Sequence, residues 1–219
     1  MKQNHEKSIK AIVFDLGGVI VNVDFNKTFE EFENKTGLTN EAIKASTFLT
    51  STYHDYESGY LNDNQFRELV CQNFGTFLQS DSFDSAWNAL LGNFNLEALN
   101  LIRELKSNYA LYLLSNTNRI HFEECNRRLQ QQYFETFETL FNGLFLSYKI
   151  GYRKPSERIF QHMLSRLGMS PQQILFIDDL EENIRSAESL GINVIHLTDN
   201  RKIASLVREK LADYELQAR

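Results

Sequence analysis

The stretch IKAIVFDLGG, residues 9–18, decides the fold of this chain. It is a short apolar run, rich in β-branched side chains, that stops at two glycines. This pattern is typical of a buried parallel strand that enters a tight turn. Asp15 stands at the carboxyl end of the predicted strand, so we expect the chemistry of the protein to begin there.

Four further runs of the same kind follow, at residues 110–115, 143–147, 174–178 and 193–197. Helical patterns separate them at residues 122–129, 156–167 and 183–190, and Gly168 and Gly191 are placed as helix stops. Strands that alternate with helices predict an α/β fold with a doubly wound, mostly parallel, Rossmann-like sheet. Ligands of such sheets bind beyond the carboxyl ends of the strands.

Residues 22–93 break this alternation, because they offer helical patterns and no convincing strand. Three aromatic stripes recur there at helical spacing, and we interpret them as the core of a small helical bundle rather than as a cofactor site. The stripes are Phe25, Phe29 and Phe32; Phe66, Leu69, Val70 and Phe74; and Phe83, Trp87, Leu90 and Leu91. We therefore predict an α-helical cap domain, residues 22–93, inserted into a core domain of residues 1–21 and 94–219.

Composition excludes several classes of function for the 219 residues. The net charge of −6 and the pI near 5.4 argue against nucleic acid or an anionic membrane as the main partner. Cys71 and Cys125 lack the spacing of metal ligands and are expected to be core thiols in a reducing compartment. Neither a secretory signal nor a membrane-spanning run is recognisable, so we expect a cytoplasmic location.

Three segments suit an anion, two at predicted strand ends and one just before a predicted helix. After Asp15, the small residues Gly17 and Gly18 allow backbone amides to approach an anion. Ser115 and Asn116 place a hydroxyl and free amides before a helix. Lys154, which precedes Pro155 and the first turn of a helix, adds positive charge. Each segment alone also fits a simpler role, as a turn, a helix N-cap or a solvated lysine.

Asp178 and Asp179 are adjacent carboxylates at the end of the fourth predicted strand, and Asn183 follows in the next helix. Two such carboxylates repel each other unless a cation is present, and hard oxygen ligands suit Mg²⁺. A simpler reading makes one aspartate a helix cap and leaves the other solvated.

The order of these four features resembles the signature of the haloacid dehalogenase superfamily, in the form that has a helical cap after the first motif. The resemblance covers nearly the whole chain. Within the superfamily, FDLGGVIVNVDFN, LLSNTNRIH, RKPSERIFQHML and FIDDLEENI look most like the bacterial alpha-glucose-1-phosphate phosphatases. The amino-terminal phosphatase domain of soluble epoxide hydrolase is a more distant likeness.

The resemblance implies a part for each motif. Asp15 would be the nucleophile that forms an aspartyl-phosphate. Mg²⁺ would be bound by Asp15, the Gly17 carbonyl, Asp178 and Asp179. Further parts implied are phosphate binding by Ser115, the Asn116 amide and Gly18, charge compensation by Lys154, and support of the metal by Asn183.

One position departs from the pattern of the superfamily, and one segment has an open role. Many phosphatases of the superfamily carry an aspartate as general acid two residues after the nucleophile, where this chain has Gly17. In the cap, the polar and aromatic residues 53–60 correspond to a substrate-facing segment, so His54 and Tyr56 are candidate sugar contacts or part of a solvated helix end. His121 follows the Ser115–Asn116 motif and could face the site, but a place at the surface is the favoured expectation.

Three functions therefore compete. The first is a Mg²⁺-dependent phosphatase that hydrolyses a small phosphorylated metabolite, with a sugar phosphate as the favoured class. The second is a haloacid dehalogenase that uses the same aspartate, against which Gly17 and the Asp178–Asp179 pair count. The third is a binding or regulatory module that keeps the fold and the metal site but lacks the acid.

Overall fold

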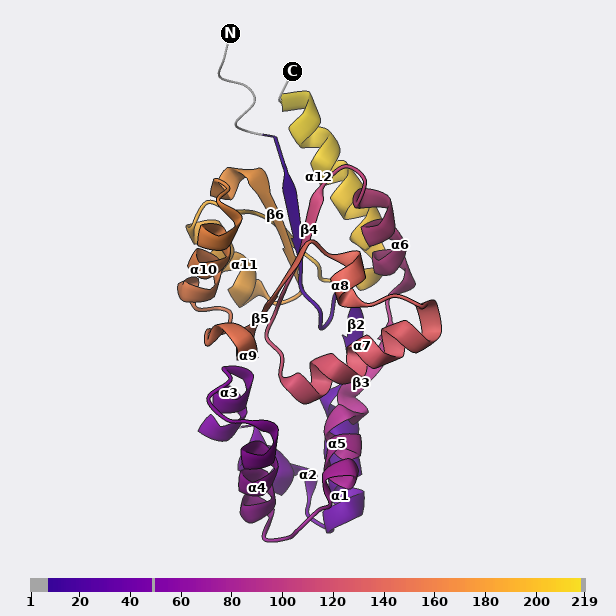
Figure 1. The fold of residues 1–219 in the computed structure, drawn as a ribbon, viewed down its shortest axis with the longest axis vertical. Coiled ribbons are helices and arrows are strands. Elements are labelled where there is room, and N and C mark those ends of the chain that lie inside the picture. Colours follow the sequence, from indigo (N-terminus) through magenta and orange to yellow (C-terminus); the bar gives the residue numbers. More distant parts are fainter. Residues whose placement is uncertain (1–7, 49, 218–219) are drawn as a thin grey trace.

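The computed structural model describes residues 8–48 and 50–217 and confirms the parallel sheet (Figure 1). The strands run in the order β5-β4-β1-β6-β7, and every neighbouring pair is parallel. Phe14 of β1 pairs with Leu113 of β4 and with Ile177 of β6, so the carboxyl ends of these strands meet at one edge. The strands are β1 (Ala11–Phe14), β4 (Ala110–Ser115), β5 (Gly143–Leu146), β6 (Ile174–Asp178) and β7 (Asn193–His196).

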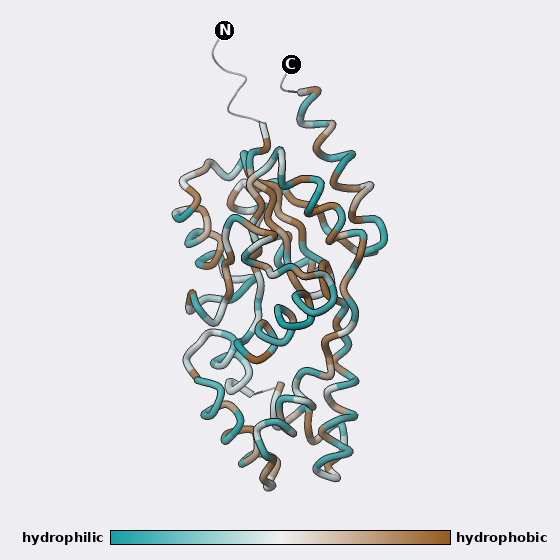
Figure 2. The backbone as a smooth tube through the Cα atoms, turned by 45° about the vertical axis from the view of Figure 1, so that its right-hand side comes forward, coloured by the Kyte–Doolittle hydropathy of each residue, from teal (hydrophilic) through white to brown (hydrophobic). Residues whose placement is uncertain are grey.

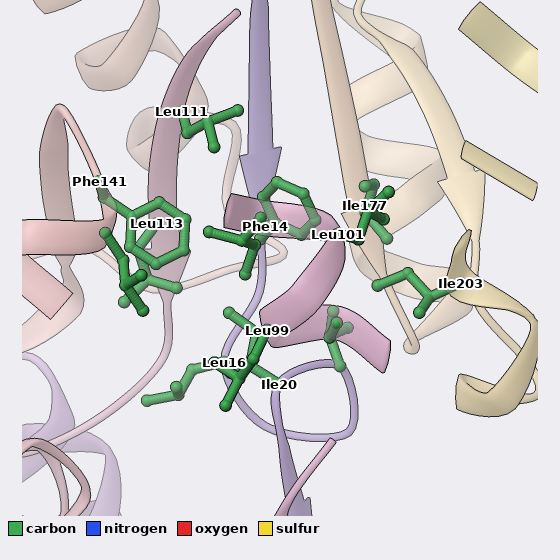
Figure 3. Packing of buried hydrophobic residues seen from close by; sticks show 14 of the residues in the cluster. Phe14, Leu16, Ile20, Leu99, Leu101, Leu111, Leu113, Phe141, Ile177 and Ile203 are labelled. Atoms are coloured by element: carbon green, nitrogen blue, oxygen red, sulfur yellow. The ribbon is translucent and has the colours of Figure 1, made fainter. Parts of the chain in front are cut away.

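Helices cover both faces of the sheet, as a doubly wound fold requires. On one face, Phe14 packs among Leu99, Leu113 and Ile177 in the larger apolar cluster (Figure 3). On the other, strand residues such as Val13 pack against α10 and α11. The helices of the core are α6 (Leu96–Leu105), α7 (Arg119–Tyr133), α8 (Phe137–Leu140), α9 (Ser147–Ile150), α10 (Glu157–Leu167), α11 (Glu181–Ser189) and α12 (Ile203–Gln217), with short 3-10 turns η3 (Pro171–Gln173) and η4 (Asn200–Lys202).

The hydropathy of the backbone follows this layering. In Figure 2 the interior strands are hydrophobic, while the surrounding helices alternate between hydrophilic and hydrophobic residues, as expected for elements with one buried face. Gly168 ends α10 in the left-handed conformation, as predicted. Ser156 caps α10, which begins at Glu157, so Pro155 lies before the helix and not in its first turn.

A helical cap lies at the far end of the molecule from the two termini (Figure 1). Its own apolar cluster is built around Phe32, Phe66, Phe83 and Trp87, which confirms the interpretation of the aromatic stripes. Four residues of the predicted stripes lie outside this cluster: Phe25 is 41% exposed, Leu69 is half-buried, and Leu90 and Leu91 belong to the apolar cluster of the core domain. The cap helices are α1 (Phe25–Thr36), α2 (Asn40–Thr47), α3 (Ser51–Glu57), α4 (Asp63–Phe74) and α5 (Ser80–Trp87), followed by the 3-10 turn η2 (Asn88–Leu90).

Two short strands join the cap to the core, and the prediction of no strand in residues 22–93 was wrong at both ends of that range. Strands β2 (Val21–Val23) and β3 (Leu91–Phe94) pair in antiparallel fashion. Each is too short to show a periodic pattern, and each depends on a partner about 70 residues away. The predicted boundaries of the cap fall within this ladder and stay a prediction. Among the described residues, no helix has the length and apolar character to cross a membrane.

Candidate active site

The carboxyl edge of the sheet brings the predicted motifs together. Asp15 follows β1 and is held beside β6 by its amide, which donates to the carbonyl of Ile177 at 2.9 Å. Ser115 ends β4 and Asp178 ends β6. All three are buried, and Asp15 and Ser115 line a cavity of about 300 Å³ that is enclosed by residues of the core and of the cap. This is the position that the fold predicts for a ligand.

Lys154 links the two buried carboxylates. Its ammonium lies 2.8 Å from Oδ1 of Asp15 and 2.6 Å from Oδ2 of Asp178, and the lysine is 2% exposed. Burial lowers the pKa of Lys154, but the charges of Asp15 and Asp178 outweigh it and the net pKa is raised. Burial raises the pKa of Asp15 to about 7 against the lowering effect of Lys154. Lys154 is therefore a charged partner of the site and not a solvated side chain.

Asn116 holds the backbone of Lys154. Its Oδ1 accepts from the amide of Lys154 at 2.7 Å, and its Nδ2 donates to the carbonyl of Lys154 at 2.8 Å. The sequence points only to the backbone amide of Asn116, so this use of the side chain was missed. It fixes the loop that follows Gly151 against the end of β4.

The acidic cluster fits a hard cation. One oxygen from each of Asp15, Asp178 and Asp179 lies within 4.8 Å of the others. Asn183 donates to both oxygens of Asp178, at 2.9 and 3.0 Å, while its own Oδ1 is buried without a partner. Three carboxylates face one ammonium, so negative charge is in excess. The donor set and the unpaired amide oxygen match a Mg²⁺ ion that carries water.

Gly17 and Gly18 are used differently. Gly18 has a φ of +72°, and a Cβ there would overlap the carboxylate of Asp179. Its amide donates to the carbonyl of Val21 at 2.8 Å. That amide is therefore engaged within the loop, and the absence of a side chain at Gly18 makes room for Asp179. Gly18 also lines the cavity, and phosphate binding by this residue stays a prediction. Gly17 lines the cavity beside Val23.

The cap contributes a polar wall from the predicted segment of residues 53–60, but through side chains that the sequence did not single out. Glu57 of α3, which is 3% exposed, accepts from the hydroxyl of Tyr53 at 2.8 Å. Arg153 approaches the same carboxylate from the core, with Nε at 2.8 Å and an ion-pair distance of 2.6 Å. Burial raises the pKa of Glu57, while Arg153 and Tyr53 oppose the rise. All three residues line the cavity.

Two predicted sugar contacts lie elsewhere. Tyr56 is 2% exposed, stacks on Phe66 at 4.0 Å and donates to Asp63, so it belongs to the core of the cap and does not line the cavity. His54 is exposed and is also not among the residues that line it. Tyr53 and Glu57 are four residues apart and share the face of α3 that is turned toward the core domain. Tyr56 lies on another face, which packs inside the cap.

His121 is buried, contrary to the prediction. Its ring stacks on Trp87 at 4.9 Å, and Nε2 lies 3.0 Å from the carbonyl of Trp87. Nδ1 lies 2.9 Å from the side-chain amide of Asn118. Burial lowers the pKa of His121 to about 4, so the ring is neutral at pH 7. The residue fastens the end of the cap to the core.

The cysteines behave as predicted. Both are free and buried, and burial raises the pKa of Cys125 to about 12. A thiol of that pKa is not a nucleophile near neutral pH.

Comparisons with known proteins identify the family. The model of the haloacid dehalogenase-like hydrolase family matches residues 9–191. The chain is 32% identical to D-ribitol-5-phosphate phosphatase from Bacteroides thetaiotaomicron over 185 residues, which cover 84% of this chain and 89% of that protein. It is 27% identical to a sesquiterpene phosphatase from Aspergillus oryzae, with 88% and 92% covered.

A solved structure supports the same assignment. A haloacid dehalogenase family enzyme from Bacteroides thetaiotaomicron, crystallised with magnesium and inorganic phosphate, superimposes with a TM-score of 0.80. Its sequence identity is 30%, and the match covers 86% of this chain and 93% of the other. The chain therefore belongs to the haloacid dehalogenase-like hydrolase family and is a phosphatase of that family.

Proposed function

We propose that this phosphatase is Mg²⁺-dependent, uses Asp15 as its nucleophile and hydrolyses a small, polyhydroxylated phosphate monoester. The observation that carries the proposal is the contact of Lys154 with both Asp15 and Asp178 at the edge where β1, β4 and β6 end. A buried carboxylate beside an ammonium and an acidic cluster has the charges that phosphoryl transfer requires.

The chain's own residues divide the reaction between them. Oδ1 of Asp15 already accepts from the amide of Leu16 and from Lys154, so we assign the attack on phosphorus to Oδ2. A bond from this oxygen to phosphorus forms as the bond to the leaving oxygen breaks, and the product is an aspartyl-phosphate. Water then attacks phosphorus and releases Asp15 and inorganic phosphate.

Ser115 and the Asn116 amide hold the phosphoryl oxygens in this scheme, and Lys154 offsets their charge. Mg²⁺, held by Asp15, the Gly17 carbonyl, Asp178 and Asp179 with Asn183 in support, supplies Lewis-acid stabilisation when bound. Gly17 offers no proton to the leaving oxygen, so the rate is expected to depend on the acidity of the leaving group.

The cavity supports a small substrate. A volume of about 300 Å³ is at the lower end of ligand pockets. One wall is apolar, with Val23, Phe25 and Leu90, and the other carries Tyr53, Glu57 and Arg153. A sugar or sugar alcohol has both apolar and hydroxyl surface and can satisfy both walls, whereas a terpenoid chain would remove water from the charged wall and offer it no hydrogen bonds in return. The ribitol phosphate relative supports the same choice.

A substrate screen tests the proposal. We expect phosphate release from sugar and sugar-alcohol phosphates in the presence of Mg²⁺ and none with excess chelator. Asp15→Asn is the matched inactive control. Release of halide from 2-haloacids without metal would favour the dehalogenase alternative, and binding without any turnover would favour the regulatory module. The cytoplasmic location and the lack of a nucleic-acid or membrane partner stay predictions.

A further inference from the structure

The cap and the core also meet away from the β2–β3 ladder and from the contact of His121 with Trp87. Glu57 of the cap and Arg153 of the core form an ion pair at 2.6 Å, in which the glutamate side chain is 4% exposed and the arginine side chain 21% exposed. The Tyr53 hydroxyl binds the other oxygen of Glu57. Both charges of an ion pair between two parts of the chain are thus largely withdrawn from water.

A glycine two residues further on lets the backbones touch. Gly59 has a φ of +74°, and a Cβ at this position would overlap the backbone carbonyl of Tyr148 in α9. The hydroxyl of Tyr60 also reaches the carbonyl of Gly151, at 3.3 Å. The end of α3 is therefore fitted against α9 by main-chain shape as well as by charge.

The core side of this contact is tied to the active site. Ser147, the first residue of α9, accepts from the amide of Thr117 and donates to its carbonyl, both at 2.9 Å. Arg153 directly precedes Lys154. A movement of the cap at this contact would therefore also displace the loop that carries Lys154 and the loop that follows Ser115.

Figure 1 places α3 beside α9 on one side of the molecule and the β2–β3 ladder on the other. The cavity lies between the two contacts, since its lining includes residues from both. We propose that Glu57, Arg153 and Gly59 form a clasp, opposite the β2–β3 connection, that holds the cap closed over the leaving group of the substrate. The expected effects of the clasp on kcat/KM rest on the proposed function, whereas the contact between cap and core and its effect on hydrogen exchange do not.

Energetics suit a contact that opens and closes. The attraction within a buried ion pair is largely offset by the loss of hydration, so the intact pair holds the cap without locking it. Removal of one partner leaves the other charge unpaired and favours the open state, in which that charge regains water. Loss of Glu57 or Arg153 alone should therefore open the cap.

Gly59→Ala tests the clasp without touching its charges, and Gly37→Ala is the matched control. Both glycines belong to the cap and have a φ of +74°, but a Cβ at Gly37 meets nothing within 4 Å. The two variants thus share the backbone cost and differ in the contact with Tyr148. Hydrogen exchange is read on the opposite partner, at residues 147–153 of the core. We expect exchange there to quicken at least tenfold in Gly59→Ala and to stay unchanged in Gly37→Ala. Equal exchange in the two variants would overturn the clasp.

The ion pair is tested by Glu57→Gln, Arg153→Met and the double variant Glu57→Leu/Arg153→Met. Exchange is followed at residues 147–153 for changes in Glu57 and at residues 53–60 for Arg153→Met. We expect each single variant to quicken exchange and to lose at least tenfold in kcat/KM for a sugar phosphate, with under threefold loss for a small aryl phosphate. The double variant should regain thermal stability, because no charge is left unpaired, but not the sugar phosphate activity. A merely structural role predicts that activity returns with stability, and that result would contradict the proposal. If the wild-type protein hydrolyses no phosphate ester, the exchange measurements alone decide whether the clasp exists.

Discussion

The side chain of Asn116 and the backbone of Lys154 exchange two hydrogen bonds, 2.7 and 2.8 Å long, across 38 residues of sequence. These bonds fix the start of the lysine side chain, and the contacts with Asp15 and Asp178 fix its end. Lys154 is thereby held in place before a substrate arrives. Such preorganisation is what makes a charge useful in catalysis.

Asn116→Ala should therefore lower kcat by about 100-fold, the cost typical of a small misplacement of a catalytic group. The fold should persist, since the bonds lost lie in a loop. Asn126→Ala is the control, because Asn126 also binds a distant backbone amide, that of Phe137, but far from the site. If Asn116→Ala and Asn126→Ala have the same kcat, Asn116 does not position Lys154 for catalysis.

Asp15→Asn should stabilise the metal-free protein, and more so as the pH rises. The folded-state pKa of Asp15, about 7, is above its ordinary value of 3.8. The stabilising contribution of the neutral carboxyl is fully present below the unfolded value and is lost as the pH rises through about 7. In chelator at alkaline pH the wild type thus holds a costly buried charge that the amide lacks.

The measurement is thermal unfolding of both proteins with excess chelator at about pH 5 and about pH 8. We expect Tm of Asp15→Asn to exceed that of the wild type by on the order of 5 °C at the higher pH, about 2 kcal/mol, and by less at the lower pH. A lower Tm for the variant at the higher pH would mean that the ion pair with Lys154 outweighs the burial of Asp15.

Asn183→Leu should weaken the metal site without removing a ligand. The amide donates to both oxygens of Asp178, and its buried Oδ1 has no partner, so it would be available to a water carried by the ion. Loss of such a supporting residue typically costs 10–100-fold in metal affinity, so half-maximal activity should require about that much more Mg²⁺. An unchanged Mg²⁺ dependence with full activity would show that Asn183 serves packing alone.

Gly17→Asp should help poor leaving groups most. A Cβ at Gly17 would lie 3.3 Å from Cγ2 of Val23, a side chain that can shift, and the φ of Gly17 is not in the left-handed region. General acid catalysis contributes on the order of 100 to 10,000-fold, so the unmodified enzyme should favour a sugar 1-phosphate over the 6-phosphate, and the variant should narrow that gap. The dependence of kcat/KM on the acidity of the leaving group is measured with a graded series of aryl phosphates in both proteins. A flat dependence in the wild type would reveal another acid.

Tyr53→Phe and Tyr56→Phe should separate substrate choice from stability. Tyr53 lines the cavity and donates to Glu57, so loss of its hydroxyl should change the ratio of kcat/KM between sugar phosphates and aryl phosphates. Tyr56 donates to Asp63 within the cap, and its change should cost about 1 kcal/mol of stability and leave the ratio alone. A shifted ratio in Tyr56→Phe would restore it as a substrate contact.

The sequence predicted the parallel sheet and the placement of the four motifs because those features are local. The apolar run before Asp15 and the helix stop at Gly168 are set by near neighbours. The joint placement of Asp15, Lys154 and Asp178 then followed from the rule that ligands bind at the carboxyl ends of parallel strands.

What the sequence did not predict depends on contacts between distant residues. The local sequence around Glu57 does not predict that this residue is buried, because its partner Arg153 is 96 residues away. The local sequence favours a surface position for His121, whereas in the structure its ring is buried by stacking on Trp87. The rotation of α3 that buries Tyr56 and exposes Tyr53 to the cavity is decided by packing against Phe66, and strands β2 and β3 exist only as a pair.

Chemical trapping of the intermediate tests the central claim, that Asp15 attacks phosphorus, most directly. The enzyme is mixed with an aryl phosphate and Mg²⁺, quenched within the first turnover and reduced with borohydride, which converts an aspartyl-phosphate to homoserine. Trypsin then releases the peptide of residues 11–27 for mass spectrometry. We predict homoserine at position 15 in an amount that matches an initial burst of aryl alcohol. Linear release of the alcohol with an unmodified peptide, or modification of another residue, would contradict the account.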